Sequence, residues 1–383
     1  MRARSRSSRL VTQDPVYLES RAPCARSLLP RLAHMQSKGA LDESGKPGSA
    51  TRPHEHDPGV AVARTRAEHV APTRETTVRI GGTSVRFGTA SWTDPTLVAP
   101  GVFYPEGVTS AEARLRYYAT RFSVVEADSS YYALPARRMT ELWVERTPAD
   151  FAFDVKAFGW MTGHAADTAR LPRDLRDALP PELAQKKRLY PKEIPRELLD
   201  EAWRLFADAM QPLHECGKLG AIFLQYPSWV RPSPHAPRML ARARARLGNL
   251  PAAVEFRHGD WLAPALRERT FALLRDHGMS YVVVDEPQGL ASSVPPDVAV
   301  TTPRLAVVRL HGRRGETWEK RGTPVLERFR YLYESEELRP WVAKVVEIAG
   351  EAEHVHVVFN NCYGNYGTTN ALEMRALVAA EAG

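Results

Sequence analysis

From about residue 78 onward, short runs rich in β-branched and aromatic residues alternate with longer amphipathic segments of helical spacing. This alternation is typical of a parallel sheet whose strands are joined by helices. The predicted strands are VRFGTA (85–90), VVEADSS (124–130), FAFDVKA (151–157), GAIFLQY (220–226), AAVEFR (252–257), SYVVVDE (280–286), LAVVRLHG (305–312) and VHVVFNN (355–361). The predicted helices occupy 109–121, 137–147, 195–216, 236–247, 265–276, 337–349 and 369–381.

Eight strands with intervening helices in roughly 300 residues favour an α/β fold of the closed (β/α)8 TIM-barrel type over an open sheet. The interval 287–304 contains four prolines and is predicted to be a loop, so a doubly wound open sheet remains the alternative. Two longer intervals, 158–194 and 313–336, follow strand ends, where barrel enzymes place substrate loops and lids. We expect 158–194 to extend over the barrel mouth.

The first 75 residues lack sustained periodicity and carry 13 Lys and Arg against 8 Asp and Glu. Their composition predicts a disordered, basic extension, although the first ten residues superficially resemble a transit peptide or a basic arm. We therefore divide the chain into an extension over 1–77 and a barrel domain over 78–383. The residues after 75 carry 39 basic against 37 acidic side chains, which makes a nucleic-acid-binding barrel an unfavoured interpretation.

Cysteine usage and hydropathy restrict the environment of the protein. Cys24, Cys216 and Cys362 are far apart and form no CxxC motif, which fits a reducing cytoplasm better than a disulfide scaffold. No apolar run approaches the ~20 residues that a membrane-spanning helix needs. A cytoplasmic protein without membrane association is the prediction.

Side-chain alternation decides which residues point into the barrel, because the helix-facing positions should be apolar. In the run 305–312, Val308 and Leu310 take the helix side, which directs Arg309 and His311 inward. The run 280–286 is almost wholly apolar, so the directions of Asp285 and Glu286 stay open. In the other strands the same rule directs inward Glu126 and Asp128, Asp154 and Lys156, Gln225, Glu255 and Arg257, and His356 and Asn360.

Charged groups converging at one end of a barrel favour a ligand site, because barrel interiors normally hold branched aliphatic side chains. Glu126 and Glu255 are candidates for acid and base, and Lys156 for an electrophilic stabiliser or an amine nucleophile. His311 is a candidate proton carrier. Mutual ion pairs, such as Glu126 with Lys156, are the structural alternative. Arg257 and Arg309 are expected to clamp a phosphate or carboxylate, and Asn360 and Asn361 to orient hydroxyl or carbonyl groups.

Common cofactor motifs are absent from the sequence. There is no GxxxxGK[ST] phosphate loop, no GxGxxG after the first strand and no HExxH. A divalent metal on Glu126, Glu255, Asp285 and His311 would be chemically reasonable, yet nothing in the spacing requires one. The cofactor is therefore left unknown and no metal ligand is assigned.

Motifs follow nearly every predicted strand. They are GTASW (88–92) with GVFYPEG (101–107), VEADSSYYALP (125–135), FDVKAFGWMTGH (153–164), VEFRHGDWL (254–262), VVVDEPQG (282–289), VVRLHGR (307–313) and VFNNCYGNYGTTNAL (358–372). Over residues 80–380 the chain thereby resembles the DUF72 (YecE-like) family, whose members are TIM-type barrels of unassigned function. Two departures are the Gly163 that separates Thr162 from His164, and Cys362 after the Asn pair.

The resemblance implies a shared pocket that also contains His164, His258 and Asp285. Together with the strand-derived residues, the predicted substrate-binding set is His164, Gln225, Arg257, His258, Asp285, Arg309, Asn360 and Asn361. The leading hypothesis is an enzyme of the hydrolase or the isomerase/lyase class that uses acid–base or hydrolytic chemistry on a small polar, anionic or sugar-like molecule. One alternative is a metal-dependent hydrolase or isomerase of the xylose-isomerase-like type, including nucleic-acid repair enzymes. Another is a non-catalytic ligand-binding or regulatory module.

Overall fold

A computed structural model describes residues 57–73 and 75–382 of the chain. Most of the predicted disordered extension therefore lies outside the described residues. The eight parallel strands are β2 (Thr83–Thr89), β3 (Val124–Ala127), β4 (Ala152–Lys156), β7 (Leu219–Tyr226), β8 (Ala252–Phe256), β9 (Ser280–Asp285), β10 (Ala306–Leu310) and β11 (His354–Phe359). Their order is β2-β11-β10-β9-β8-β7-β4-β3, and β1 (Thr77–Ile80) pairs antiparallel with β2.

The barrel closes between β2 and β3, where the two backbones approach closely. Ala90 and Glu126 form a parallel bridge, and the Ser91 N–H donates to the Glu126 carbonyl at 2.9 Å. The Tyr118 hydroxyl accepts from the Thr89 N–H at 2.8 Å and donates to the Val124 carbonyl at 3.3 Å. This closure confirms the predicted barrel and rejects the open doubly wound sheet.

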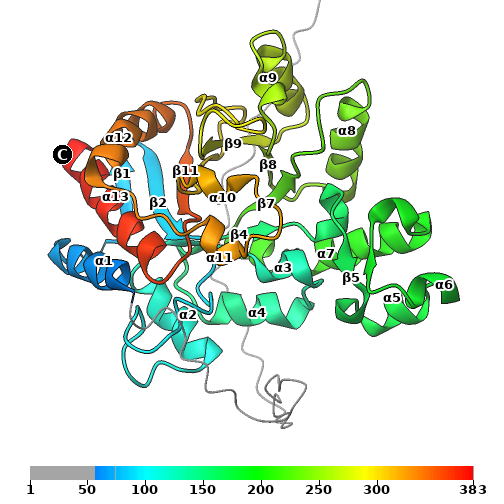
Figure 1. The fold of residues 1–383 in the computed structure, drawn as a ribbon, viewed down its shortest axis with the longest axis horizontal. Coiled ribbons are helices and arrows are strands. Elements are labelled where there is room, and N and C mark those ends of the chain that lie inside the picture. The colour runs from blue at the N-terminus through cyan, green and yellow to red at the C-terminus, as the bar shows by residue number, and fades with distance from the viewer. Residues whose placement is uncertain (1–56, 74, 383) are drawn as a thin grey trace, which may run out of the picture. The chain divides into compact units, whose positions relative to one another are not determined.

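Helices surround the strands, as Figure 1 shows. The main ones are α2 (Ala111–Ala119), α4 (Arg137–Glu145), α7 (Arg196–Glu215), α8 (Ala236–Leu247), α9 (Arg267–Asp276), α12 (Ser335–Ala349) and α13 (Tyr366–Ala382). The Ser110 side chain caps α2 by accepting from the Ala113 N–H at 3.0 Å. All seven agree with the predicted helices to within a few residues. Residues 286–305 contain no helix, which confirms the loop predicted from the prolines of 287–304.

The helix α1 (Pro58–His69) and the start of β1 lie before the predicted domain boundary at residue 77. Asp57 caps α1 by accepting from the Gly59 N–H at 2.8 Å, and Pro58 occupies the first turn. In the last turn of α1, Arg66 forms hydrogen bonds to Glu373 of α13 at 2.8 and 2.9 Å. The Asp-Pro start signal was present in the sequence, but the short, weakly amphipathic helix that follows it gave little periodicity.

The long connections contain short elements. Residues 158–194 hold η1 (Gly159–Thr162), η2 (Thr168–Arg170), α5 (Arg173–Asp177), α6 (Pro181–Ala184), η3 (Pro191–Glu193) and a small hairpin of β5 (Ala166–Asp167) and β6 (Arg188–Leu189). The others are α3 (Ser129–Tyr132), η4 (Gly259–Leu262), α10 (Gly315–Trp318) and α11 (Val325–Arg328). Figure 1 shows α10 and α11 in front of the strands.

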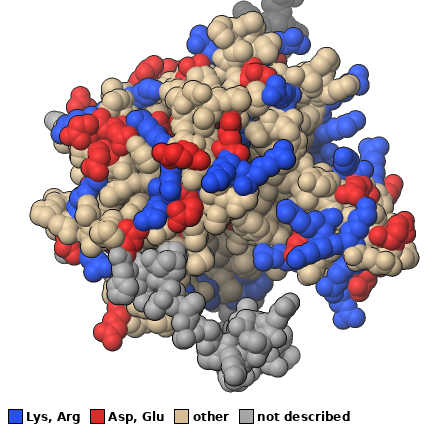
Figure 2. Space-filling model, viewed as in Figure 1, with Lys and Arg blue, Asp and Glu red and all other residues tan. Residues whose placement is uncertain are grey.

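Surface charge is distributed unevenly on the face that Figure 2 shows. Lys and Arg are prominent on the side where α8 and the β5 hairpin lie, and Asp and Glu lie among them near the hairpin. The sequence of α8 contains four arginines and no acidic residue. The helix α8 is therefore a basic element on a barrel whose overall charge is near neutral. Within the described ranges, no helix is long and apolar enough to cross a membrane.

Candidate functional site

A cavity of ≈ 670 Å³ opens at the C-terminal ends of the barrel strands. Four predicted site residues line it, namely Lys156, Gln225, Arg257 and Asn360. Aromatic rings of Trp92, Tyr131, Tyr132, Trp143 and Phe329 form part of the lining, and its other charged side chains are Asp94, Asp128, Arg146 and Arg328. This combination of apolar wall and a few charges is typical of small-molecule sites.

Arg309 of β10 is the centre of a charged layer behind this lining. Its guanidinium donates to both carboxylate oxygens of Glu126 at 2.7 Å, to Gln225 Oε1 at 3.2 Å and to Glu255 Oε2. Arg309, Glu126 and Glu255 are completely buried. Because its donors are taken by internal carboxylates, Arg309 cannot act as the ligand clamp that the sequence suggested.

His311 and Glu255 belong to the same buried layer. Asn360 Nδ2 donates to His311 Nδ1 at 2.9 Å, so the neutral ring carries its proton on Nε2, which lies 3.3 Å from Glu255 Oε1. Burial lowers the pKa of His311 to about 3 and outweighs the attraction of Glu255. Burial opposes ionisation of Glu255, but Arg309 and His311 hold its pKa well below the ordinary range. Neither side chain lines the cavity, so both act through their neighbours.

Glu126, Asp128 and Lys156 bring acid–base chemistry to the cavity edge. Burial raises the pKa of Glu126, and the hydrogen-bonded Asp128 raises it further against the opposing charge of Arg309. For Asp128, burial is outweighed by Lys156 and Glu126, so its pKa is lowered. The two carboxyl groups are therefore coupled, with a raised pKa at Glu126 and a lowered pKa at Asp128. Lys156 Nζ lies 3.7 Å from Asp128 Oδ1, so its ion pair is with Asp128 and not with Glu126.

Arg257 connects the cavity to a second buried carboxylate. Its Nη1 donates to Glu255 Oε1 at 2.9 Å and lies 3.5 Å from Glu286 Oε2, while its guanidinium stacks 4.9 Å from the Trp318 ring centre. The structure thus settles the direction of Glu286, which points to Arg257. Burial raises the pKa of Glu286 to about 7, against the opposing charge of Arg257.

The raised pKa of Glu286 predicts a pH-dependent stability. The folded chain binds this proton up to about pH 7, whereas an unfolded glutamate releases it near pH ~4.3. Between those values, rising pH costs about 3 kcal/mol of stability, which Glu286→Gln should restore above pH 7. Urea unfolding at pH 5 and pH 8 measures the difference. Glu351→Gln, at an exposed position, is the matched control, and equal pH responses of both variants would contradict the assignment.

Besides Arg309 and His164, three predicted binding residues lie away from the cavity lining. His258 accepts from the Asp260 N–H at 3.2 Å and caps η4. Asp285 accepts from Arg313 at 2.9 and 3.0 Å and from the Tyr333 hydroxyl. Asn361 donates to the Tyr331 carbonyl at 2.8 Å and to Asn370 at 2.9 Å. Asp285 and Asn361 thus anchor the connection 313–336 instead of meeting a ligand directly.

His164 lies behind the aromatic wall. Its Nδ1 is 2.9 Å from the Thr162 hydroxyl, and its ring meets those of Tyr131 and Trp229 edge-on at 5.2 and 5.4 Å. Burial, with Lys156 and Arg257 nearby, lowers its pKa to about 4. No residue of 158–194 lines the cavity itself, but His164 and Arg170 of this interval pack against the lining residues Tyr131 and Tyr132.

The four candidate metal ligands do not form a donor set. Glu126 and Glu255 bind Arg309, while Asp285 binds Arg313. Among the described residues, no group of three or more His, Cys, Asp or Glu is arranged to hold a metal ion. These four side chains therefore do not fit the divalent-metal site that the sequence analysis left open.

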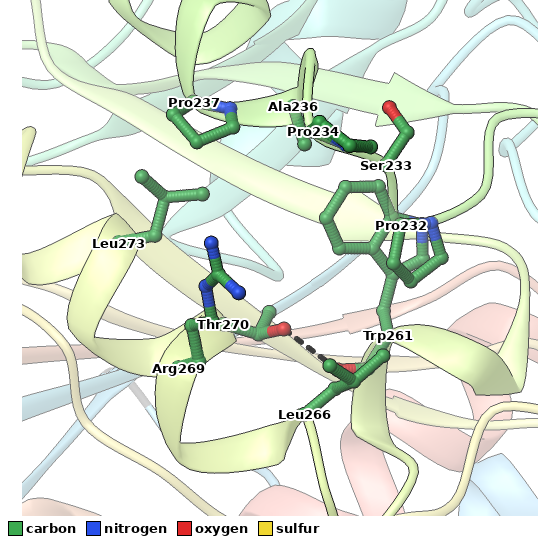
Figure 3. Close-up of a pocket in the computed structure, with 10 residues that line it drawn as sticks. All are labelled: Pro232, Ser233, Pro234, Ala236, Pro237, Trp261, Leu266, Arg269, Thr270 and Leu273. Atoms are coloured by element: carbon green, nitrogen blue, oxygen red, sulfur yellow. Dashed lines mark hydrogen bonds between the residues drawn. The ribbon is translucent and has the colours of Figure 1, made fainter.

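A second pocket, of ≈ 260 Å³, lies between α8, α9 and the loop before α8 (Figure 3). Its lining is mainly apolar, and Arg269 is the one charged residue among the ten that line it. The Thr270 hydroxyl donates to the Trp261 carbonyl at 2.7 Å. Without a carboxylate or a histidine in its lining, this pocket offers no acid–base pair, and the barrel mouth remains the candidate site.

Sequence reasoning left several lining residues outside its proposed site. Asp128 had the inward direction but no assigned role. Trp143 and Arg146 lie at and just after the end of α4, and Arg328 ends α11. Strand alternation cannot reach side chains on helices and connections. Only the position of 313–336 after a strand indicated that Arg328 could reach the mouth.

The fold and the site define a TIM-type barrel with a polar, aromatic-walled cavity at its C-terminal mouth. The chain belongs to the family described as "Protein of unknown function DUF72", whose model matches residues 86–383. It is 29% identical over 300 residues to UPF0759 protein YunF of Bacillus subtilis, covering 78% of this chain and 95% of that protein.

Crystal structures of two DUF72 family proteins resemble this barrel. The Thermotoga maritima protein is 30% identical, with a TM-score of 0.60 over 77% of this chain and 98% of its own. The Enterococcus faecalis protein is 25% identical, with a TM-score of 0.58 over 77% of this chain and 97% of its own. The resemblance predicted from the strand-end motifs is thereby confirmed.

Proposed function

We propose that the chain is an enzyme that carries out acid–base chemistry on a small polar molecule bound in the mouth cavity. The observation that carries this proposal is Asp128, whose Oδ1 is buried and has no hydrogen-bond partner among the described residues. Asp128 lines the cavity, and burial raises the pKa of Glu126 behind it. Such a pair can accept a substrate proton at Asp128 and stabilise the change in charge through Glu126.

Lys156 and the aromatic wall supply the remaining functions. The Lys156 ammonium lies beside Asp128 and 4.9 Å from the Tyr131 ring centre, where it would stabilise negative charge that develops on a substrate oxygen. Trp92, Tyr131 and Tyr132 offer flat faces on which a sugar-like ring would stack. Hydrolysis and isomerisation both use these elements. The scarcity of cysteine in the sequence supports a cytoplasmic location for this activity.

The test is to incubate the protein with phosphorylated and unphosphorylated sugars and polyols and to measure their conversion by mass spectrometry. Asp128→Asn should lower turnover roughly 100-fold while leaving binding intact, because the amide keeps the shape but cannot take a proton. Asp276→Asn, at an exposed position on α9, is the control and should retain full turnover. A ligand that stabilises the wild-type fold but is recovered unchanged would identify a binding module instead.

A further inference from the structure

The connection 313–336 is fixed at both ends and carries α11 over the cavity. Near its start, Arg313 binds Asp285, and near its end Asn361 holds the Tyr331 carbonyl. Between these anchors, Val325, Leu326, Arg328 and Phe329 line the cavity. This segment therefore brings one positive charge, that of Arg328, to a cavity whose other walls come from strand ends and from α2 and α4.

Arg328 has little compensation for its charge. Its Nε is buried without a hydrogen-bond partner, and its Nη2 makes a 3.5 Å contact with the Lys320 carbonyl. Burial lowers the pKa of Arg328, and the positive charge of Arg257 lowers it further. No ion pair to Arg328 occurs within the described residues. A partly buried guanidinium that faces another cation is costly unless an anion lies between them.

Arg257 is the second guanidinium group in the cavity that has unused hydrogen-bond donors. Only its Nη1 is used by Glu255 and Glu286, so within the described part of the chain Nε and Nη2 make no hydrogen bond. Its side chain is 15% exposed, and it lines the same cavity as Arg328. One guanidinium comes from the barrel and the other from the connection above it.

We propose that Arg257 and Arg328 together bind a phosphate group of the substrate, and that this contact ties the segment 313–336 to the barrel. The inference rests on the proposed function, since it names the substrate class of the same cavity. A phosphate presents oxygens in several directions and can meet two guanidinium groups that approach from different sides. A carboxylate offers one planar edge, which suits a single guanidinium. Arg328 thus takes the clamp position that the sequence gave to Arg309.

Binding of inorganic phosphate to the full chain, measured by calorimetry at constant ionic strength, tests the clamp. Arg328→Gln should weaken phosphate binding at least ~10-fold, since charged hydrogen bonds of this kind contribute about 1.5–3 kcal/mol. Arg321→Gln, at an exposed position in the same segment, should bind as the wild type does. Phosphate should also slow tryptic cleavage after Lys320 and Arg321 in the wild type and not in Arg328→Gln.

The outcomes separate this inference from the proposed function. Undiminished phosphate binding by Arg328→Gln, or tighter binding of malonate than of phosphate by the wild type, would overturn the phosphate clamp. Asp128→Asn should bind phosphate normally. If phosphate binding depends on Arg328 while Asp128→Asn keeps full turnover, the clamp stands and the acid–base assignment fails.

Discussion

Replacing Arg309 by methionine should destabilise the protein by about 3 kcal/mol or more, because breaking a buried ion pair leaves its partners uncompensated. Arg309, Glu126 and Glu255 are fully buried, and the guanidinium fills the space between the two carboxyl groups. Methionine keeps an unbranched stem, but it is shorter than arginine and has no charge and no donor. Equilibrium unfolding in urea, with wild type and variant at the same pH, gives the difference in the free energy of unfolding.

The pH dependence distinguishes lost electrostatics from lost packing. Without Arg309, the pKa of Glu255 should rise, so the folded variant would bind more protons than the wild type. Its deficit should therefore shrink between pH 8 and pH 5. Arg309→Lys keeps one charge without the planar fork and should lie between wild type and Arg309→Met. A deficit of less than ~1 kcal/mol, or one that grows in acid, would show that Arg309 does not hold the layer together.

The barrel and its inward charges were predictable because both follow from alternation along a strand. Asp154 and His356, assigned inward on that basis, meet across the barrel at 2.9 Å, and Arg309 reaches Glu126 and Glu255. The periodicity of a strand is local, so it can be read without knowing the partners. Alternation does not show how deeply an inward side chain is buried below the barrel mouth. For this reason Arg309 was assigned to a ligand that it cannot reach.

Residues at strand ends were harder to place. Past the last ladder hydrogen bond the chain turns, and alternation no longer fixes the direction of a side chain. Asp285 is the last residue of β9 and Asn361 lies just after β11, and both turn toward the connection 313–336. Glu286 and Asn360 turn toward the axis instead. Arg328 depends on the path of that whole connection. The partners that decide these positions are distant in sequence, so no local pattern contains them.

Gly88→Ala should be among the most disruptive single-methyl changes in the barrel, because it acts on the seam where β2 meets β3. A Cβ at Gly88 would overlap the carbonyl oxygen of Val124 and lie 2.8 Å from its carbonyl carbon. Since both clashing atoms belong to backbone, relief requires the strands to separate, which would break the bridge between Ala90 and Glu126. We expect a loss of about 3 kcal/mol or more, at the upper end of overpacking effects.

Gly82→Ala is the matched control for the seam, since a Cβ there would have no atom within 4 Å. That substitution should change the free energy of unfolding by no more than about 0.5 kcal/mol. Separation of the strands would also displace Glu126 from Arg309, so Gly88→Ala should weaken the acid–base pair as well as the fold. If both alanine variants unfold at the same urea concentration as the wild type, the close approach of β2 and β3 does not close the barrel, and the position of Glu126 needs another support.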